Sequence, residues 1–131
     1  MCILAIGFSI LSTSSGIVGF TRSYSALLAH ERIAINAVCP NIVRTNISTA
    51  EFYDIVSRKD LFTPMESMVQ VFASLLGSDS RNGCIFECGP RGVTLRDHPD
   101  YMDEATKEAC DLIRDRSVGM HRNSWHIDNG S

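Results

Sequence analysis

Three short apolar runs, separated by two segments with helical periodicity, constrain the fold of this 131-residue chain more than any other feature. The runs cover residues 2–11, 32–39 and 83–89, and near-continuous apolar runs of this length are typical of buried parallel strands. Between the first two runs, apolar residues recur every three or four positions over residues 16–30, which is the period of a helix with one buried side. This order predicts an α/β fold: a parallel βαβαβ unit, equal to half of a doubly wound, Rossmann-like sheet, with a C-terminal helix.

The second helical segment, residues 63–77, carries start and stop signals. Thr63, followed three residues later by Glu66, has the pattern of a capping box, and Pro64 suits the first helical turn. Gly77 suits a C-terminal cap. We expect its buried face to consist of four apolar residues: Met68, Phe72, Leu75 and Leu76.

The other segments are less regular. We expect residues 46–62 to form a mobile segment with a short helix. We expect residues 99–116 to form a helix, because their acidic residues come early and their arginines late, as the helix dipole favours. Residues 117–131 are expected to form a flexible tail, so the partial Rossmann-like domain is predicted to span residues 1–116. The "GPRG" stretch at residues 89–92 predicts a turn rather than a phosphate-binding loop.

Composition argues against several classes of function. The net charge of −3 and the scattered arginines give no surface for nucleic acid. Five cysteines without a C-x-x-C pair favour reduced thiols in a cytoplasmic protein. Residues 2–11 have the length of a signal-peptide core but lack a basic segment before them, and they are too short to span a membrane. His121 and His126 have no third ligand at a suitable spacing, so no metal site is predicted.

The stretch "INAVCPNIVRTNI", residues 35–47, predicts the position of a ligand site. Its alternating apolar residues end at Pro40, where a buried strand is expected to open into a loop. In open α/β sheets, ligands bind at the carboxyl ends of the strands.

The same region carries a resemblance to a known family. "GIVGFTRSYSALLAHERIAINAVCPNIVRT" resembles the C-terminal half of the short-chain dehydrogenase/reductases, in which a helix near "GVVGFTRSLA" leads to a strand such as "IRVNAVCPG" and a Pro-Gly-x-Val-x-Thr loop. "TPMESMVQVFASLLGSDSRNGCIFECGPRG" is similar to the next helix and last core strand of that family. The resemblance covers residues 16–92.

The resemblance implies a cofactor, a substrate class and site residues. The loop after the strand would lie against the nicotinamide end of NAD or NADP, with four contributing residues: Pro40, Asn41, Ile42 and Thr45. The Thr45 hydroxyl could bond the carboxamide or a phosphate, since a hydroxyl both donates and accepts. Asn41 departs from the family's glycine, and asparagine tolerates positive φ better than most residues. The substrate would be a small alcohol or ketone. The family's helix matching residues 16–30 commonly packs at a dimer interface, which allows a homodimer.

The family's proton relay is missing from this sequence. That relay is a Tyr-x-x-x-Lys pair, and counting back from "GIVGFTRS" places the pair at Ile10 and Ser14. No tyrosine in this chain is followed four residues later by lysine. "YSALL" from Tyr24 imitates the motif up to its lysine, but its place in the helical stripe predicts a core residue.

A second alignment places a family serine in this chain. "FSILSTSSG" resembles the family strand ending "IVNTSSxxG", which would make Ser15 the substrate-orienting, catalytic serine and place Ser12 where asparagine is common. The loop with tyrosine and lysine would then be missing before Gly16. The alternative is that "STSSG" is only a polar turn.

The family's glycine-rich G-x-x-x-G-x-G loop is also not found in this sequence. We therefore expect an NAD(P)-dependent oxidoreductase by descent that is inactive in this truncated form. The alternatives are a catalytically dead remnant that acts as a binding or dimerisation module, and a truncated or misjoined product without a stable fold.

Overall fold

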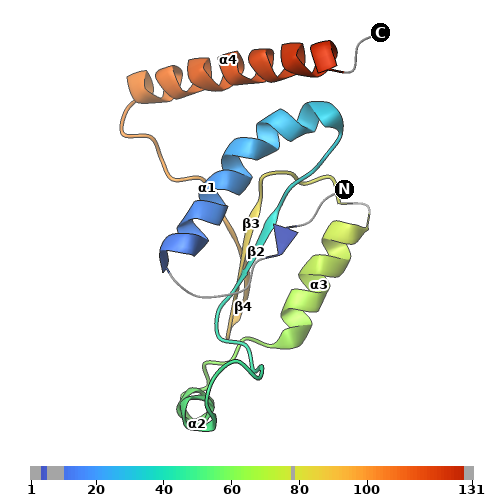
Figure 1. Cartoon of the computed structure of the whole chain (residues 1–131). Helices are drawn as coiled ribbons and strands as arrows, with labels where there is room; N and C mark the ends of the chain where they lie inside the picture. Colours follow the sequence, from blue (N-terminus) through green and yellow to red (C-terminus); the bar gives the residue numbers. More distant parts are fainter. Residues whose placement is uncertain (1–3, 6–10, 78, 129–131) are drawn as a thin grey trace.

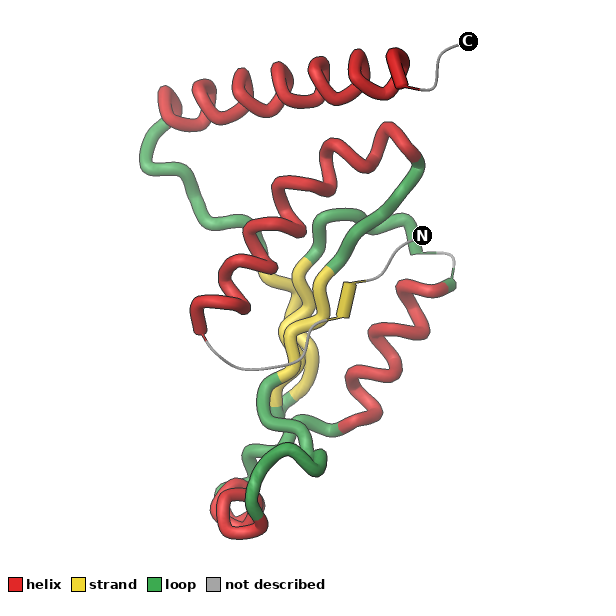
Figure 2. The backbone as a smooth tube through the Cα atoms, in the orientation of Figure 1, coloured by secondary structure: helices red, strands yellow, loops and turns green. Residues whose placement is uncertain are grey.

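A computed structural model describes residues 4–5, 11–77 and 79–128, with side-chain environments for residues 16–77 and 79–123. Its strands form one sheet in the order β1-β2-β3-β4 (Figures 1 and 2). β1, β2 and β3 are parallel, whereas β4 is antiparallel to β3. The first three strands agree with the predicted parallel unit, and the sheet as a whole is mixed. The strand bounds are β1 Leu4–Ala5, β2 Ala37–Pro40, β3 Ile85–Gly89 and β4 Gly92–Arg96.

Helices follow most of the predicted segments. The α-helices are α1 Leu11–Leu28, α2 Ala50–Arg58, α3 Met65–Leu76 and α4 Glu104–Asp128, and α1 continues into a short 3-10 helix, η1 Ala29–Glu31. The predictions of helices within 16–30, 46–62 and 63–77 are therefore confirmed. α4 confirms the last predicted helix but continues past residue 116 to Asp128.

The two helical crossovers of the parallel strands have opposite hand. The chain steps from β1 to β2 to β3 in one direction across the sheet. In Figure 1, however, α1 lies on one face of the sheet and α3 on the other. An ordinary doubly wound sheet covers both faces by reversing its strand order. Because this sheet does not reverse, one crossover must be left-handed, which parallel units rarely are.

The start of the chain differs from its prediction. Of the strand expected over residues 2–11, the structure describes only β1, and residues 6–10 lie outside the described part. The helix begins at Leu11, so "STSSG" is helical and its interpretation as a turn or strand end is wrong. Apolar character alone does not separate a short strand from a helix, so it did not predict that a helix begins at Leu11.

The segment after β3 forms a hairpin that the sequence analysis only partly predicted. "GPRG" is the predicted turn, with Gly89 opposite Gly92, and the chain returns as β4. Gly92 has a φ of 131°, which favours glycine. β4 was missed because its residues are all exposed and give no buried period.

The hydrophobic core lies between α3 and the sheet. Five buried residues form it: Val38, Val71, Leu75, Phe86 and Cys88. Met68 and Phe72 pack against this cluster, as predicted. Leu76 was predicted to be buried but is 67% exposed, so that prediction is wrong. The positions of the helix that pack in or against this cluster are 68, 71, 72 and 75, and Leu76 falls just outside this arc.

The predicted capping box of α3 is wrong. The N-cap is Pro64, and no side chain caps it. Thr63 is buried instead, where its hydroxyl donates to the Cys88 carbonyl at 3.3 Å. Gly77 does occupy the C-cap position, as predicted. Thr63 thus attaches the start of α3 to the end of β3 rather than closing the helix end.

α1 contacts the sheet through polar residues. Among the residues of α1 whose side-chain environment is described, 16–28, the buried ones are Thr21 and Ser25, whereas Tyr24 is 39% exposed and stacks on Phe20 with 4.9 Å between ring centroids. The prediction that Tyr24 belongs to the core is therefore wrong. The next residue, Ser25, faces inward instead. The buried side of the helix passes through positions 21 and 25, one residue after the predicted positions 20 and 24.

Two asparagines fix the end of α1 to the starts of β2 and β3. Asn82 accepts from the Ile35 amide at 2.9 Å and donates to the Ser25 carbonyl at 2.9 Å. The Asn36 side chain accepts from the Cys84 amide at 3.0 Å. These bonds satisfy backbone groups where the strands begin, and they hold the amino ends of the parallel strands together.

Candidate functional site

The loop at the carboxyl end of β2 is fixed at its first residues. The Asn41 amide donates to the Cys88 carbonyl at 2.8 Å, and the Ile42 carbonyl accepts from the Thr63 amide at 2.7 Å. Asn41 is not among the described residues with positive φ, so it replaces the family's glycine without backbone strain. The first bond ties the loop to β3, and the second ties it to the segment that leads into α3.

Tyr53, which the sequence analysis missed, organises the rest of this loop. It lies in α2, is 8% exposed, and its phenol oxygen accepts from the amides of Thr45 and Ser48, each at 3.3 Å. The Thr45 hydroxyl lies 3.1 Å from the same oxygen. The only signal in the sequence was the three-residue spacing of Tyr53 and Val56, the buried residues of α2.

The hydrogen bonds at Tyr53 determine what Thr45 can offer. A phenol oxygen that accepts two amide protons has its lone pairs occupied, so toward Thr45 the neutral phenol must donate its own proton. The Thr45 hydroxyl then accepts from Tyr53 and keeps its own proton for another acceptor. The hydrogen bond with Thr45, aided by the backbone amides, lowers the pKa of Tyr53 because it stabilises the phenolate.

Arg44 covers this cluster from outside. Its guanidinium carbon lies 5.8 Å from the centroid of the Tyr53 ring and 5.2 Å from that of Phe62. The two rings are 5.7 Å apart and tilted. Thr49 caps α2 by accepting from the Phe52 amide at 3.3 Å, which sets where the helix begins and so where Tyr53 points.

The predicted cofactor-binding residues and the predicted serine lie in different elements. Pro40, Asn41, Ile42 and Thr45 lie at the end of β2 and in its loop. Ser15 lies within α1 rather than at the end of a strand, and its side chain is outside the described environments. A helical segment at this point agrees with the first alignment, in which the tyrosine and lysine positions precede "GIVGFTRS".

Two thiols near the site are held in their neutral form. Burial, and to a lesser extent the carboxylate of Glu87, raises the pKa of Cys39. Burial also raises the pKa of Cys88, with Cys39 and Glu87 adding to the effect. Cys39 and Glu87 are opposite one another in the register of β2 and β3. Neither cysteine has the electropositive surroundings that an activated nucleophile needs.

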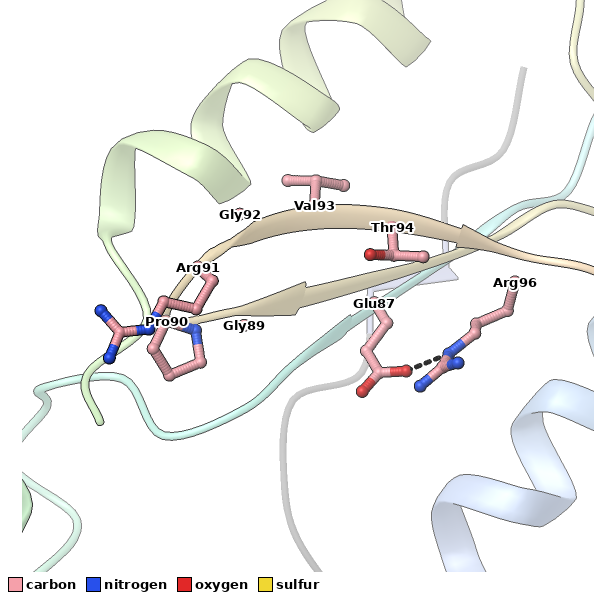
Figure 3. A pocket seen from close by; sticks show the side chains of 8 residues that line it. All are labelled: Glu87, Gly89, Pro90, Arg91, Gly92, Val93, Thr94 and Arg96. Atoms are coloured by element: carbon pink, nitrogen blue, oxygen red, sulfur yellow. Dashed lines mark hydrogen bonds and ion pairs between the residues drawn. The ribbon is translucent and has the colours of Figure 1, made fainter. Parts of the chain in front are cut away.

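A hollow of about 250 Å³ lies along the β3–β4 hairpin (Figure 3), and its lining residue Gly89 directly follows Cys88, whose carbonyl accepts from Asn41. Its charged side chains already have partners. Arg96 pairs with Glu87 across the hairpin, and Arg91 pairs with Asp60 at 3.0 Å. With its charges neutralised and its residues largely exposed, this hollow has no feature that selects a ligand.

Two kinds of site are not found in the described part of the chain. No three residues among histidine, cysteine, aspartate and glutamate gather closely enough to hold a metal ion. No helix over the described residues combines the length and the apolar character needed to cross a membrane.

Comparison with known proteins supports a relationship to the short-chain dehydrogenase/reductases. A curated relative, the short-chain dehydrogenase/reductase prx7 of Penicillium rubens, is 26% identical over 123 aligned residues. The alignment covers 79% of this chain and 43% of that protein, so the chain spans less than half of the length of the relative that it matches. No family model matches the chain.

Proposed function

We propose that this chain carries the nicotinamide side of an NAD(P) site of the short-chain dehydrogenase/reductase type, whose reaction moves a hydride between the cofactor and a small alcohol or ketone. The observation that supports it best is the ordered loop from Pro40 to Thr45 at the carboxyl end of β2. The similarity to prx7 supports the same family.

The hydrogen-bonding groups of this loop that are still available suit a carboxamide ligand. A carboxamide needs both a donor and an acceptor with fixed positions. The amide and carbonyl of Val43 have no hydrogen-bond partner among the described residues, and the Thr45 hydroxyl retains its proton. Tyr53 holds Thr45 in place through two hydrogen bonds, one with its amide and one with its hydroxyl, and a third bond ties the Ser48 amide to the same oxygen. When bound, the cofactor supplies the hydride, and the loop orients its nicotinamide.

The 131-residue chain by itself is proposed not to catalyse hydride transfer. It has no Tyr-x-x-x-Lys pair, and an unassisted phenol of pKa ~10 is a poor proton donor at neutral pH. It also offers no glycine-rich loop for the pyrophosphate. We propose that its affinity for the whole cofactor is correspondingly weak.

Two measurements test this proposal. Titration calorimetry with NAD and with NADP at millimolar concentration should show no saturable binding in the micromolar range. A spectrophotometric assay with a panel of alcohols and ketones should show no production of NADH or NADPH. Micromolar binding, or turnover that disappears in Ser15→Ala, would contradict the proposal.

A second candidate function is a binding or association module. α3 is apolar on two sides, because beyond its core-facing residues it exposes Met65, Val69 and Leu76. These three residues lie on one side of the helix at spacings of four and seven. A module whose partner covers this stripe would lose that partner in Val69→Lys, whereas the nicotinamide-side site would be unchanged.

A further inference from the structure

α4 is the outermost layer of the molecule and has two different sides. In Figures 1 and 2 it lies over α1, with no described element on its other side. Toward the body of the protein, His121 pairs with Glu31 of η1, with 2.5 Å between Nε2 and Oε1. Away from it, Leu112 and Ile113 are 65% and 66% exposed. Two large apolar side chains thus stand side by side on an open helix surface.

Two charged residues lie in line with Leu112 along the axis of α4, one on each side of it. Glu108, Leu112 and Arg116 are spaced by four residues, so they follow one another along one side of α4. Neither Glu108 nor Arg116 has an opposite charge three or four residues away. Elsewhere in the helix such pairs form: Lys107 with Glu104 at 3.1 Å and Arg114 with Asp111 at 2.8 Å.

Among the described residues, therefore, Glu108 and Arg116 are exposed charges without an ion-pair partner. They lie at equal distances in sequence on either side of Leu112. In an antiparallel second copy of the helix, the same three residues run in the opposite direction. Glu108 of each copy then lies opposite Arg116 of the other, with the two Leu112 residues between them. This side of α4 is complementary to itself in an antiparallel arrangement, which is the requirement for a twofold interface.

We propose that this side of α4 is a docking surface for a second copy of the chain, crossing antiparallel at Leu112. Leu112 would pack on Leu112 of the second copy, and Glu108 would face Arg116 of the second copy, twice by symmetry. Ala105 and Gly119, seven residues before and after Leu112, are small enough to let the helices approach closely.

The charge of the whole helix supports the same occupant. Residues 104–113 contain three acids and one lysine, a net charge of −2, and residues 114–123 contain three arginines and one aspartate, a net charge of +2. A second copy in antiparallel orientation places each half against its opposite, whereas a parallel copy would place like charges together. This proposal is independent of the proposed cofactor site.

The interface also differs from the one that the family resemblance implied. That interface would involve the helix matching residues 16–30, which is α1. In this chain α1 is the helix on which α4 packs. The outward surface is therefore provided by α4.

Sedimentation equilibrium of the full chain tests the proposal. The unmodified chain should be a dimer in the micromolar range. Glu108→Arg and Arg116→Glu should each raise the dissociation constant on the order of tenfold, because every new contact is between like charges. Mixing the two variants should restore association, since each supplies the charge that the other lacks. Asp54→Arg, an exposed charge reversal in α2, is the control and should leave association unchanged.

Circular dichroism of each variant checks that α4 stays helical, and the mixing result reports on the interface even if one variant is less stable. A monomeric unmodified chain would overturn the proposal. So would a dimer whose dissociation constant neither charge reversal changes from that of the unmodified chain, or singly reversed variants that do not associate when mixed.

Discussion

The two helices that flank the sheet are held to it by different means. α3 places Val71 and Leu75 in an apolar cluster with the buried residues of β2 and β3. α1 presents Thr21 and Ser25 to the interior and carries its aromatic pair outside. Apolar burial therefore holds α3 against the sheet, whereas α1 is positioned by the hydrogen bond from Asn82 to the Ser25 carbonyl and by the close approach of Gly83 to Ser25.

Loss of apolar volume under α3 should have the largest effect. Leu75→Ala leaves a cavity in the centre of the core and should lower the free energy of unfolding by about 2–5 kcal/mol. Urea denaturation monitored by circular dichroism measures it. The matched control is Leu76→Ala, next in sequence but exposed, which should change stability by no more than about 0.5 kcal/mol. Equal effects of the two substitutions would place the core elsewhere.

On the α1 side, Gly83→Ala should be the most damaging change. Gly83 has a φ of +76°, and a Cβ there would lie 2.5 Å from Ser25 Oγ. Strain and collision together should cost about 1–3 kcal/mol. Gly16→Ala, where a Cβ meets nothing within 4 Å, is the control and should not destabilise the chain.

A second variant separates the two causes. Adding Ser25→Ala to Gly83→Ala removes the nearest atom and should recover part of the lost stability. No recovery at all would mean that the backbone conformation alone is responsible.

Tyr24→Ala should have a smaller effect, because Tyr24 is 39% exposed and stacks on Phe20. Loss of the stacked pair should cost about 0.5–1.5 kcal/mol in the same denaturation experiment. A loss of about 3–5 kcal/mol, which is typical of a buried aromatic residue, would instead support the sequence-based prediction that Tyr24 belongs to the core.

The smallest predicted effect has the opposite sign. Thr21 Oγ1 is buried without a hydrogen-bond partner, so Thr21→Val, which keeps the shape, should raise stability by about 1 kcal/mol. Thr63→Val should lower it by about the same amount, because the Thr63 hydroxyl does bond to Cys88. If both substitutions destabilise the protein, then Thr21 has a partner in solution.

The part of the fold that sequence predicted well is the part held by apolar burial. The strand ending at Pro40 and the strand over 85–89 are short apolar runs bounded by proline or glycine, and the helix over 65–76 has apolar residues every three or four positions. The start of α1 was not predicted, because the apolar residues before Leu11 and the small polar residues after it fit more than one structure.

The candidate site divides in the same way. The end of the strand at Pro40 followed from its apolar residues, and the assignment of the loop residues to a cofactor stays a prediction. Tyr53 could not be assigned from sequence, because its role comes from amides of Thr45 and Ser48 that the fold brings to one oxygen. A backbone hydrogen bond leaves no trace in residue identity, so a residue that collects such bonds is found only in the structure.

The central claim is that the chain carries only the nicotinamide side of a cofactor site. It can be tested by NMR, by titrating the isotopically labelled chain and recording its backbone amide chemical shifts. The two ligands are the halves of the cofactor, nicotinamide mononucleotide and AMP, each at millimolar concentration. Nicotinamide mononucleotide should shift the amides of the loop, Val43 and Thr45 above all, and AMP should leave them unchanged. Unchanged loop amides with nicotinamide mononucleotide, or equal shifts with AMP, would contradict the account.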